Sequence, residues 1–304
     1  MPFGLTNAVA TFCALMDKLF AGYQWAFVLC FIDDRLIFTP DDFDLHLTHL
    51  EKVLIQIQKA NMKLKLSKCH FAAAELPFLG HIVGRFGLKM DPAKVNKLKL
   101  IKFPVNKKQV RQFLGLAGYF RDFIKNFAEI AAPLSNLTRD TQPDNFELST
   151  AEKEAVITLK QKVCEYPVLQ FPDFNLSFIL ETDASNIQIA AVLLQQKQEH
   201  LVLISCSSRL LSSAESNYSI VEKEALAVVW GVTHYRPYLF GRNFLVITDH
   251  KSLQYLYNFK DTNVRLVRWI LALQEYDFDV KYRSGNLNTF ADALSRLPVE
   301  EQLN

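Results

Sequence analysis

Four acidic residues in the C-terminal half of the chain stand in settings that suit metal ligands. They are Asp183 in LETDAS, Glu224 in EKEALA, Asp249 in ITDH and Asp292 in ADALSR. Carboxylates are hard oxygen donors, and a cluster of them can hold two Mg²⁺ or Mn²⁺ ions. Two such ions can activate water and stabilise the leaving oxygen in phosphodiester hydrolysis.

The elements around these acids decide whether they can meet. The sequence pattern predicts that Asp183 and Asp249 each end a strand, and that Glu224 and Asp292 each lie in an early helical turn. All four could then converge at one edge of a sheet. Such a cluster would repel itself and raise some of its own pKa values, so it implies bound cations. Taken singly, each acid would more commonly be a helix cap or a solvated charge.

The spacing of apolar residues predicts a chain of mixed α and β structure. A polar stretch at 138–145 contains Pro143 and predicts a linker, so the main boundary is expected there. The C-terminal order suits a sheet with helices on both faces. Helices are expected over 8–21, 45–60, 92–137 with breaks at Pro104 and Pro133, 150–164, 219–235, after Asp249 and from 289; strands are expected over 26–32, 36–39, 178–182, 190–195, 201–205, 244–248 and 278–282.

Composition excludes several classes of protein. The chain has 304 residues, half of them apolar, so it can bury a substantial core. Its five cysteines are widely spaced without a Cys-x-x-Cys pair, which predicts neither a disulfide framework nor a zinc ribbon. No apolar run approaches the roughly 18 residues of a membrane span. We therefore expect an intracellular protein that does not enter a membrane.

Charge is informative only locally, because the formal net charge is +2. Between Lys89 and Arg111 the only acid is Asp91, so this segment could form a stripe that contacts phosphates. Lys107, Lys108 and Arg111 are its candidate contacts. The alternative is a solvated helical face.

The N-terminal part carries a second pair of acids. Asp33 and Asp34 fall between two expected strands, at a hairpin turn where adjacent carboxylates could bind a metal ion. His46 and His49 have the spacing of a helix surface, and no cysteine pair completes a zinc site. Zinc is therefore not expected.

Residues 146–298 resemble the ribonuclease H domain of gypsy-class LTR retrotransposon Pol polyproteins. Besides the four acids, the stretches YPVL, FPDF, RPYLFG and LQEYDF carry this resemblance. It implies a ribonuclease H-like mixed α/β domain that cleaves the RNA of RNA/DNA hybrids with two Mg²⁺ or Mn²⁺ ions. The resemblance assigns Asp183, Glu224, Asp249 and Asp292 as catalytic metal ligands, and it favours Glu224 over Glu222.

This segment departs from the family in places. Gln188-Ile189-Ala190-Ala191 stands where the family usually has glycines, which predicts crowding of the backbone near the metals. The loop before Asp292 lacks the histidine that cellular enzymes of this fold carry. None of these departures removes a ligand.

The N-terminal part resembles a reverse transcriptase. MPFGLTNA resembles the nucleotide-pocket stretch of the palm, and FIDD resembles the catalytic hairpin with Asp33 and Asp34. Phe78, Leu79, Gly80 and His81 resemble the primer grip, and residues 109–121 resemble the thumb and connection. The implied domains are a partial palm at 1–83, thumb/connection at 84–145, the ribonuclease H-like domain at 146–298 and a tail at 299–304.

The resemblance also bears on polymerase activity. The family needs an aspartate on an earlier palm strand, which would precede Met1, and Arg35 adds a cation beside the Asp pair. Polymerase activity is therefore expected to be lost. The alternatives are an inactive, transposon-derived nucleic-acid-binding protein, or a polymerase part that functions in a longer or complemented chain. The expected partners are an RNA/DNA hybrid and a template-primer duplex, in the cytoplasm, the nucleus or retrotransposon particles.

Overall fold

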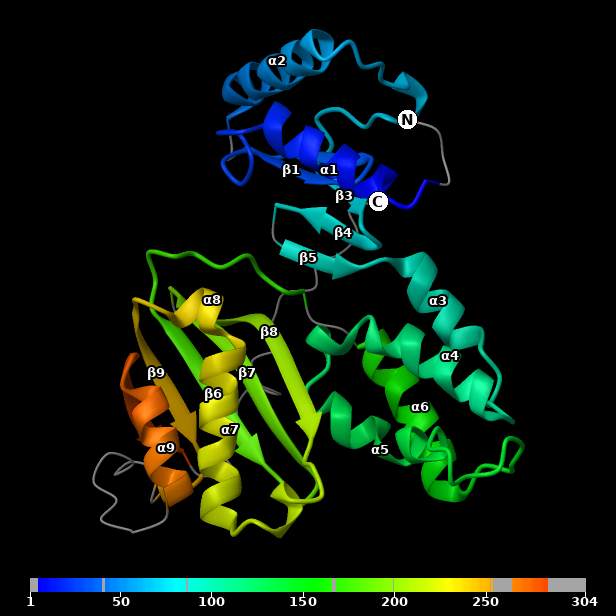
Figure 1. The fold of residues 1–304 in the computed structure, drawn as a ribbon, viewed down its shortest axis with the longest axis vertical. Helices are drawn as coiled ribbons and strands as arrows, with labels where there is room; N and C mark the ends of the chain where they lie inside the picture. Colours follow the sequence, from blue (N-terminus) through cyan, green and yellow to red (C-terminus); the bar gives the residue numbers. More distant parts are fainter. Residues whose placement is uncertain are drawn as a thin grey trace. The chain divides into compact units, whose positions relative to one another are not determined.

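The structure is a computed structural model that describes residues 5–39, 42–85, 87–165, 168–198, 200–251, 253 and 264–283. It divides into two compact units, Met1–Leu79 and Gly80–Asn304 (Figure 1). Each unit has an apolar core of its own and is described separately.

The first unit contains the predicted hairpin. Strands β1 and β2 pair antiparallel, so the predicted hairpin is present. Asp33 lies in its turn as predicted, whereas Asp34 is already the first residue of β2 and pairs with Phe31. Met16, Phe20 and Val53 pack in the core of this unit. Its elements are α1 (Ala8–Leu19), β1 (Val28–Phe31), β2 (Asp34–Ile37), α2 (Phe43–Lys59), the 3-10 helix η1 (Leu66–Lys68) and β3 (Glu75–Phe78).

The second unit begins with a β-hairpin and a group of helices. Pro104 separates two helices as predicted, but the predicted break at Pro133 is wrong, because Pro133 lies inside α5. Ala131 and Leu134 on the same helix are buried, and this packing stabilises α5 against the loss of one backbone hydrogen bond. The elements are β4 (His81–Gly84), β5 (Gly87–Met90), α3 (Pro92–Leu100), α4 (Lys107–Gly118), η2 (Arg121–Phe123), α5 (Phe127–Leu137) and α6 (Thr150–Cys164).

A five-stranded sheet follows, in the order β10-β9-β6-β7-β8. β6, β7 and β8 form an antiparallel meander, whereas β9 runs parallel to both β6 and β10. All five strands predicted for this region are present. They are β6 (Phe178–Ala184), β7 (Gln188–Lys197), β8 (His200–Leu210), β9 (Asn243–Thr248) and β10 (Asp277–Tyr282).

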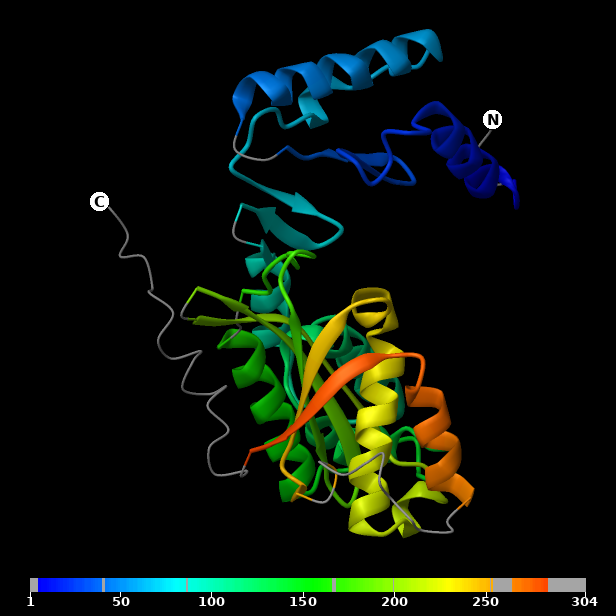
Figure 2. The same ribbon diagram turned by 90° about the vertical axis from the view of Figure 1, so that its left-hand side faces the viewer.

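Helices cover both faces of this sheet, as the sequence predicted. Figure 2 shows α7 and α9 on one side of the sheet and α6 on the other. Along β7, Ala191 packs toward α7, and the next residue, Val192, packs into the core of the α3–α6 helices. This alternation is what a strand buried on both faces requires. The remaining helices are η3 (Glu215–Asn217), α7 (Ile220–His234), α8 (Arg236–Leu239) and α9 (Val264–Leu273).

The segment 138–145 connects α5 to α6, which pack against each other. The helices before and after it share one apolar core with the sheet, and the division into connection and nuclease domains stays a prediction. Most of the helix expected after Asp249, and all of the last helix, lie outside the described residues. None of the described helices has the length and apolar character needed to cross a membrane.

Candidate active site

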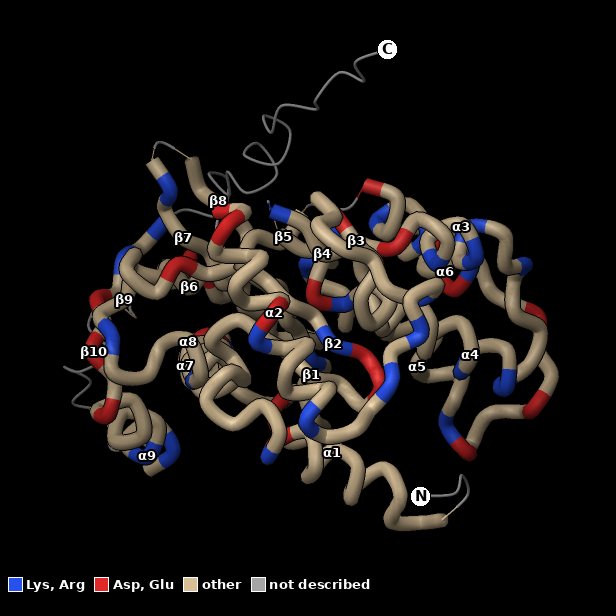
Figure 3. Tube along the Cα trace, turned by 90° about the horizontal axis from the view of Figure 1, so that it is seen from above, with Lys and Arg blue, Asp and Glu red and all other residues tan. Residues whose placement is uncertain are grey.

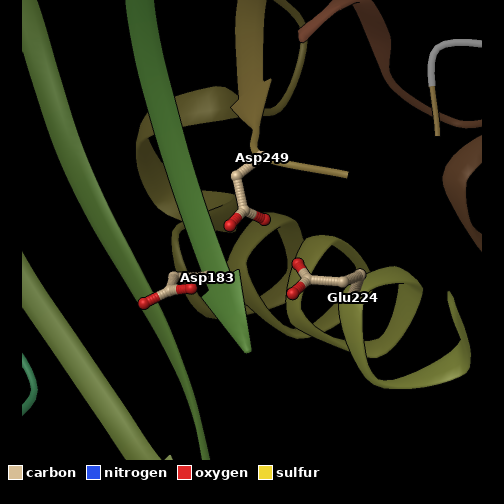
Figure 4. Close-up of side chains that lie close together, drawn as sticks. All are labelled: Asp183, Glu224 and Asp249. Atoms are coloured by element: carbon tan, nitrogen blue, oxygen red, sulfur yellow. The ribbon is translucent and has the colours of Figure 1, made fainter. Parts of the chain in front are cut away.

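Three of the four predicted acids come together in space. Asp183 lies near the end of β6, Asp249 directly follows β9, and Glu224 lies on α7. One carboxylate oxygen from each lies within 4.8 Å of the other two (Figure 4). Within the described part of the chain this is the only group of three or more Asp, Glu, His or Cys residues arranged to hold a metal ion. Asp292 lies outside the described residues.

Local structure explains why these side chains meet. β6 and β9 are parallel neighbours with Glu181 opposite Ile247, so their carboxyl ends reach the same edge of the sheet. Ser219 begins α7 through a capping box, in which its hydroxyl accepts from the amide of Glu222 and the Glu222 carboxylate accepts from the amide of Ser219. The cap sets the start of the helix and therefore places Glu224 in its second turn, toward the strand ends.

The electrostatics of the cluster favour a bound cation. Burial, together with the charges of Asp249 and Asp183, raises the pKa of Glu224 to about 8. Burial and Asp249 also raise the pKa of Asp183, and Lys125 partly offsets this shift. The Oε2 atom of Glu224 is buried without a hydrogen-bond partner among the described residues. An unpartnered buried oxygen among mutually repelling carboxylates fits a hard divalent cation.

A pocket opens beside these acids, and its wall includes two cations that sequence reasoning missed. Arg283 follows β10, and its pairing with β9 brings it to the sheet edge. Parallel pairing of β9 and β10, if predicted from the sequence, would have placed Arg283 near Asp249. Lys125 comes from the turn before α5, and no sequence signal connects it with the acids. The lining residues are Lys125, Glu181, Thr182, Asp183, Ala190, Val192, Ile247, Thr248, Asp249 and Arg283.

The expected crowding by the alanines that follow Ile189 is not found. The β6–β7 pairing is continuous, with Asp183 opposite Ala190. Ala191 faces α7 at Gly231, where an added Cβ would lie 3.1 Å from the Cβ of Ala191. The missing side chain of Gly231 leaves room for Ala191, so the helix that carries Glu224 can pack closely on the sheet.

Asp33 and Asp34 are both exposed at the hairpin of the first unit. Asp34 begins β2, and Ile32 before the pair has a left-handed φ of 48°. Arg35 donates to the backbone carbonyl of Asp33 and to the sulfur of Met16. Its guanidinium is therefore directed toward α1. No third acid joins the pair among the described residues.

The histidines of α2 have protein partners. The Nδ1 atoms of His46 and His49 lie 3.2 and 2.9 Å from Oγ1 of Thr39, and the His49 ring stacks on Phe27. These contacts anchor α2 to the end of the hairpin.

The predicted primer-grip residues, 78–81, lie at the boundary between the two units in the sequence. Phe78 and Leu79 end the first unit, and Gly80 begins the second. Nδ1 of His81 lies 2.9 Å from the Tyr119 hydroxyl. Gly80 has a φ of +78°, a left-handed conformation that favours glycine, and an added Cβ would also displace the end of the Lys94 side chain, whose Nζ would lie 1.8 Å away.

The basic stripe is only partly available to a ligand. Figure 3 marks Lys and Arg along α3 and α4. Lys107 is buried, with Nζ 3.6 Å from the Asp144 carboxylate. Arg111 donates to the carbonyl of Thr138, whereas Lys108 is exposed. Lys107 therefore holds the 138–145 segment, and Lys108 is the more accessible cation.

Two family models match the chain. Residues 1–83 match the reverse transcriptase (RNA-dependent DNA polymerase) family, and residues 173–276 match the RNase H-like domain found in reverse transcriptase. The second match contains Asp183, Glu224 and Asp249.

Curated relatives match almost the whole chain. The Pol polyprotein from transposon 297 of Drosophila melanogaster is 42% identical over 99% of this chain, and that from transposon opus is 38% identical over 99%. The Tf2-3 polyprotein of Schizosaccharomyces pombe is 32% identical over 99%. The chain spans 28%, 31% and 23% of these relatives.

Solved structures share the fold. The foamy viral protease-reverse transcriptase in complex with dsDNA matches 94% of this chain and 60% of its own, with a TM-score of 0.80 and 21% identity. The same protein with an RNA/DNA hybrid matches 100% of this chain and 40% of its own, with a TM-score of 0.76 and 20% identity. With the motifs, the family models and the relatives in agreement, the chain belongs to the transposon Pol polyproteins, as a reverse transcriptase segment followed by an RNase H-like segment.

Proposed function

We propose that this chain hydrolyses the RNA strand of RNA/DNA hybrids endonucleolytically, with a divalent metal at Asp183, Glu224 and Asp249. The observation that carries the proposal is the convergence of these three carboxylates, with one oxygen of each within 4.8 Å of the other two. Oε2 of Glu224, on one of these residues, is buried without a hydrogen-bond partner among the described residues. The match of residues 173–276 to the RNase H-like family supports it.

The three acids would together coordinate two Mg²⁺ or Mn²⁺ ions. Glu224 is buried, whereas Asp183 and Asp249 line the pocket from which a substrate would approach. We propose Asp292 as a fourth ligand from its sequence setting alone. When bound, the ions supply an activated water and stabilise the leaving oxygen. The protein holds the carboxylates in place before the ions bind, which limits the reorganisation needed for catalysis.

The proposed substrate is a hybrid duplex. The solved neighbours hold dsDNA and an RNA/DNA hybrid, which supports a duplex as partner of this chain. Selection of RNA would depend on duplex shape and on contacts to the 2′-hydroxyl groups.

Cleavage of an RNA-labelled hybrid by the purified chain in Mg²⁺ and in Mn²⁺ tests the proposal. We expect metal-dependent internal cuts in RNA that disappear in Asp249→Asn. Asp277→Asn is the matched control, because Asp277 is exposed and pairs with Asn243 at the other end of β9. Hybrid binding without cuts by the folded chain would reject nuclease activity in favour of the binding-protein alternative.

Primer extension in the same preparation tests the reverse transcriptase segment. Asp33 and Asp34 are exposed at a hairpin without a third acidic ligand among the described residues. We therefore expect no extension by this chain alone. Extension that is lost in Asp33→Asn would contradict this expectation.

A further inference from the structure

The turn before α5 is attached to the sheet at the level of the active site. Asp183, Ala190 and Ser208 are register partners on three adjacent strands, so their side chains share one face of the sheet. The Oγ atom of Ser208 accepts from the amide of Ala128 at 2.9 Å, and its carbonyl accepts from Arg121 at 2.6 Å. Residues 121–128 are therefore held against the row of the sheet that contains Asp183.

A second contact fixes the start of α5. The side-chain oxygen of Gln188 accepts from the amide of Glu129, and its amide nitrogen donates to the Glu129 carboxylate, both at 2.9 Å. Gln188 is 2% exposed and Glu129 is half-buried, so the Gln188 side of this pair lies in the interior. Ser208 on β8 and Gln188 on β7 thus bind both ends of the segment 121–129. The loop within this segment therefore has little freedom to move.

Lys125 lies in the middle of this attached loop and reaches the active-site pocket. Its neighbours Phe123 and Ile124 are buried, and Asn126 adopts a left-handed φ of 59° that turns the chain into α5. The Lys125 side chain lines the same pocket as Asp183 and Ala190. The small side chain of Ala190 leaves space between the lysine and the carboxylates.

The Lys125 ammonium group is not neutralised by an ion pair within the described part of the protein. The other cation of the pocket, Arg283, pairs with Glu181 at 2.8 Å. Lys125 has no hydrogen bond or ion pair to any described residue, although its charge acts on Asp183. An ammonium group beside a metal-binding cluster would weaken the binding of a cation, and it would attract an anion. A phosphodiester is the anion that the proposed reaction brings to this pocket.

We propose that Lys125 binds a backbone phosphate beside the one that is cut, so that the helical region preceding the nuclease domain supplies a substrate contact. The inference rests on the proposed function, because it needs a nucleic-acid strand in the pocket. Lys125 acts as a binding residue that contributes to the affinity for the strand beside the carboxylates. The loop that carries it, attached to β7 and β8, keeps the charge at a fixed position along the strand.

The test measures the salt dependence of hybrid binding without cleavage. A fluorescent RNA/DNA hybrid is titrated with the full chain carrying Asp249→Asn, in EDTA, from 50 to 200 mM KCl. Loss of one phosphate contact reduces the slope of log affinity against log salt by about 0.9. We expect this reduction, with affinity lowered roughly 3- to 10-fold, when Lys125→Gln is added. Lys125→Arg should retain the slope. Lys153→Gln, an exposed lysine of α6, is the matched control and should leave the slope unchanged.

Cleavage kinetics with Asp249 intact give a second readout. Lys125→Gln should raise the KM for the hybrid while kcat changes little, because the contact is present both before and during the reaction. Unchanged slope and KM in a folded Lys125→Gln protein would overturn the inference and leave the nuclease proposal standing. A reduced slope in a chain whose parent never cleaves would keep the contact and reject the nuclease.

Discussion

Arg283 connects the two strands that carry Asp183 and Asp249. Its Nη1 donates to Oε1 of Glu181 at 2.8 Å, and its backbone amide donates to the carbonyl of Thr248 at 2.9 Å. Glu181 lies two residues before Asp183 on β6, and Thr248 directly precedes Asp249. Arg283 therefore contacts β6 close to Asp183 and β9 next to Asp249, and it links the two segments that carry these carboxylates.

Arg283→Gln should destabilise the protein and slow cleavage. The Glu181 side chain is 8% exposed, so loss of its partner leaves a buried carboxylate without compensation. We expect the free energy of unfolding to fall by about 2 kcal/mol in urea titrations. Cleavage should slow at least tenfold (~1.4 kcal/mol), because the carboxylates would lose their fixed spacing.

Two further variants separate this effect from a general loss of charge. Lys162→Gln removes an exposed ion pair with Glu165 and should change stability by less than about 1 kcal/mol. Adding Glu181→Gln to Arg283→Gln should recover much of the lost stability, because the uncompensated charge is then gone. Glu181→Gln is also measured alone. If the loss of stability in the double variant equals the sum of the losses in Arg283→Gln and Glu181→Gln, the two side chains are not coupled.

Glu224 should make the metal-free protein less stable as pH rises. Its folded pKa of about 8 lies above the ordinary value of 4.5, so the folded state keeps a proton that the unfolded chain has released. Stability should therefore fall between about pH 4.5 and 8 and level off above. Glu224→Gln removes this penalty, and in EDTA at pH 8.5 it should raise Tm by about 3–6 °C.

The same variant should lose its response to metal. Metal ions need the deprotonated carboxylate, so the rise in Tm on adding Mg²⁺ should grow between pH 6 and 9 in the parent and be much smaller in Glu224→Gln. Glu154→Gln, on the exposed side of α6, should behave like the parent. A pH-independent response to Mg²⁺ would argue against Glu224 as a ligand.

Gly231→Val should disturb the packing of α7 on the sheet. A Cβ at this position would already lie 3.1 Å from Ala191 and 3.4 Å from Leu180, and valine adds two methyl groups. We expect a loss of about 1–3 kcal/mol in thermal or urea unfolding. Gly115→Val is the control, because Gly115 is also helical and has no atom within 4 Å of an added Cβ. Equal losses in both variants would mean that helix propensity accounts for the effect.

Cys206 should resist thiol reagents in the native protein. It is 1% exposed on β8, and burial raises the pKa of its thiol to about 12. Cys164 is exposed and should react first. A timed iodoacetamide pulse followed by mass spectrometry should label Cys206 only under unfolding conditions. Early labelling would show that β8, which holds the Lys125 loop, opens in the native state.

Much of the fold followed from local sequence patterns. The helix predicted over 150–164 matches α6, and the strands predicted around Asp183 and Asp249 are β6 and β9. In these elements, apolar residues recur at the spacing of a helix or a strand. This spacing is visible in the sequence because one face of each element is buried. Pro133 was misjudged because a local rule for helix breaking competes with burial of the surrounding α5 side chains.

From the sequence alone came the types and settings of the metal-binding acids, because each motif is carried by neighbouring residues. Only the tertiary structure decided that Glu224 lies within reach of Asp183, that Arg283 clamps Glu181, and that Lys125 enters the pocket. These relationships join residues far apart in the chain. They depend on strand pairing and on the packing of helices against the sheet, which no short stretch of sequence contains.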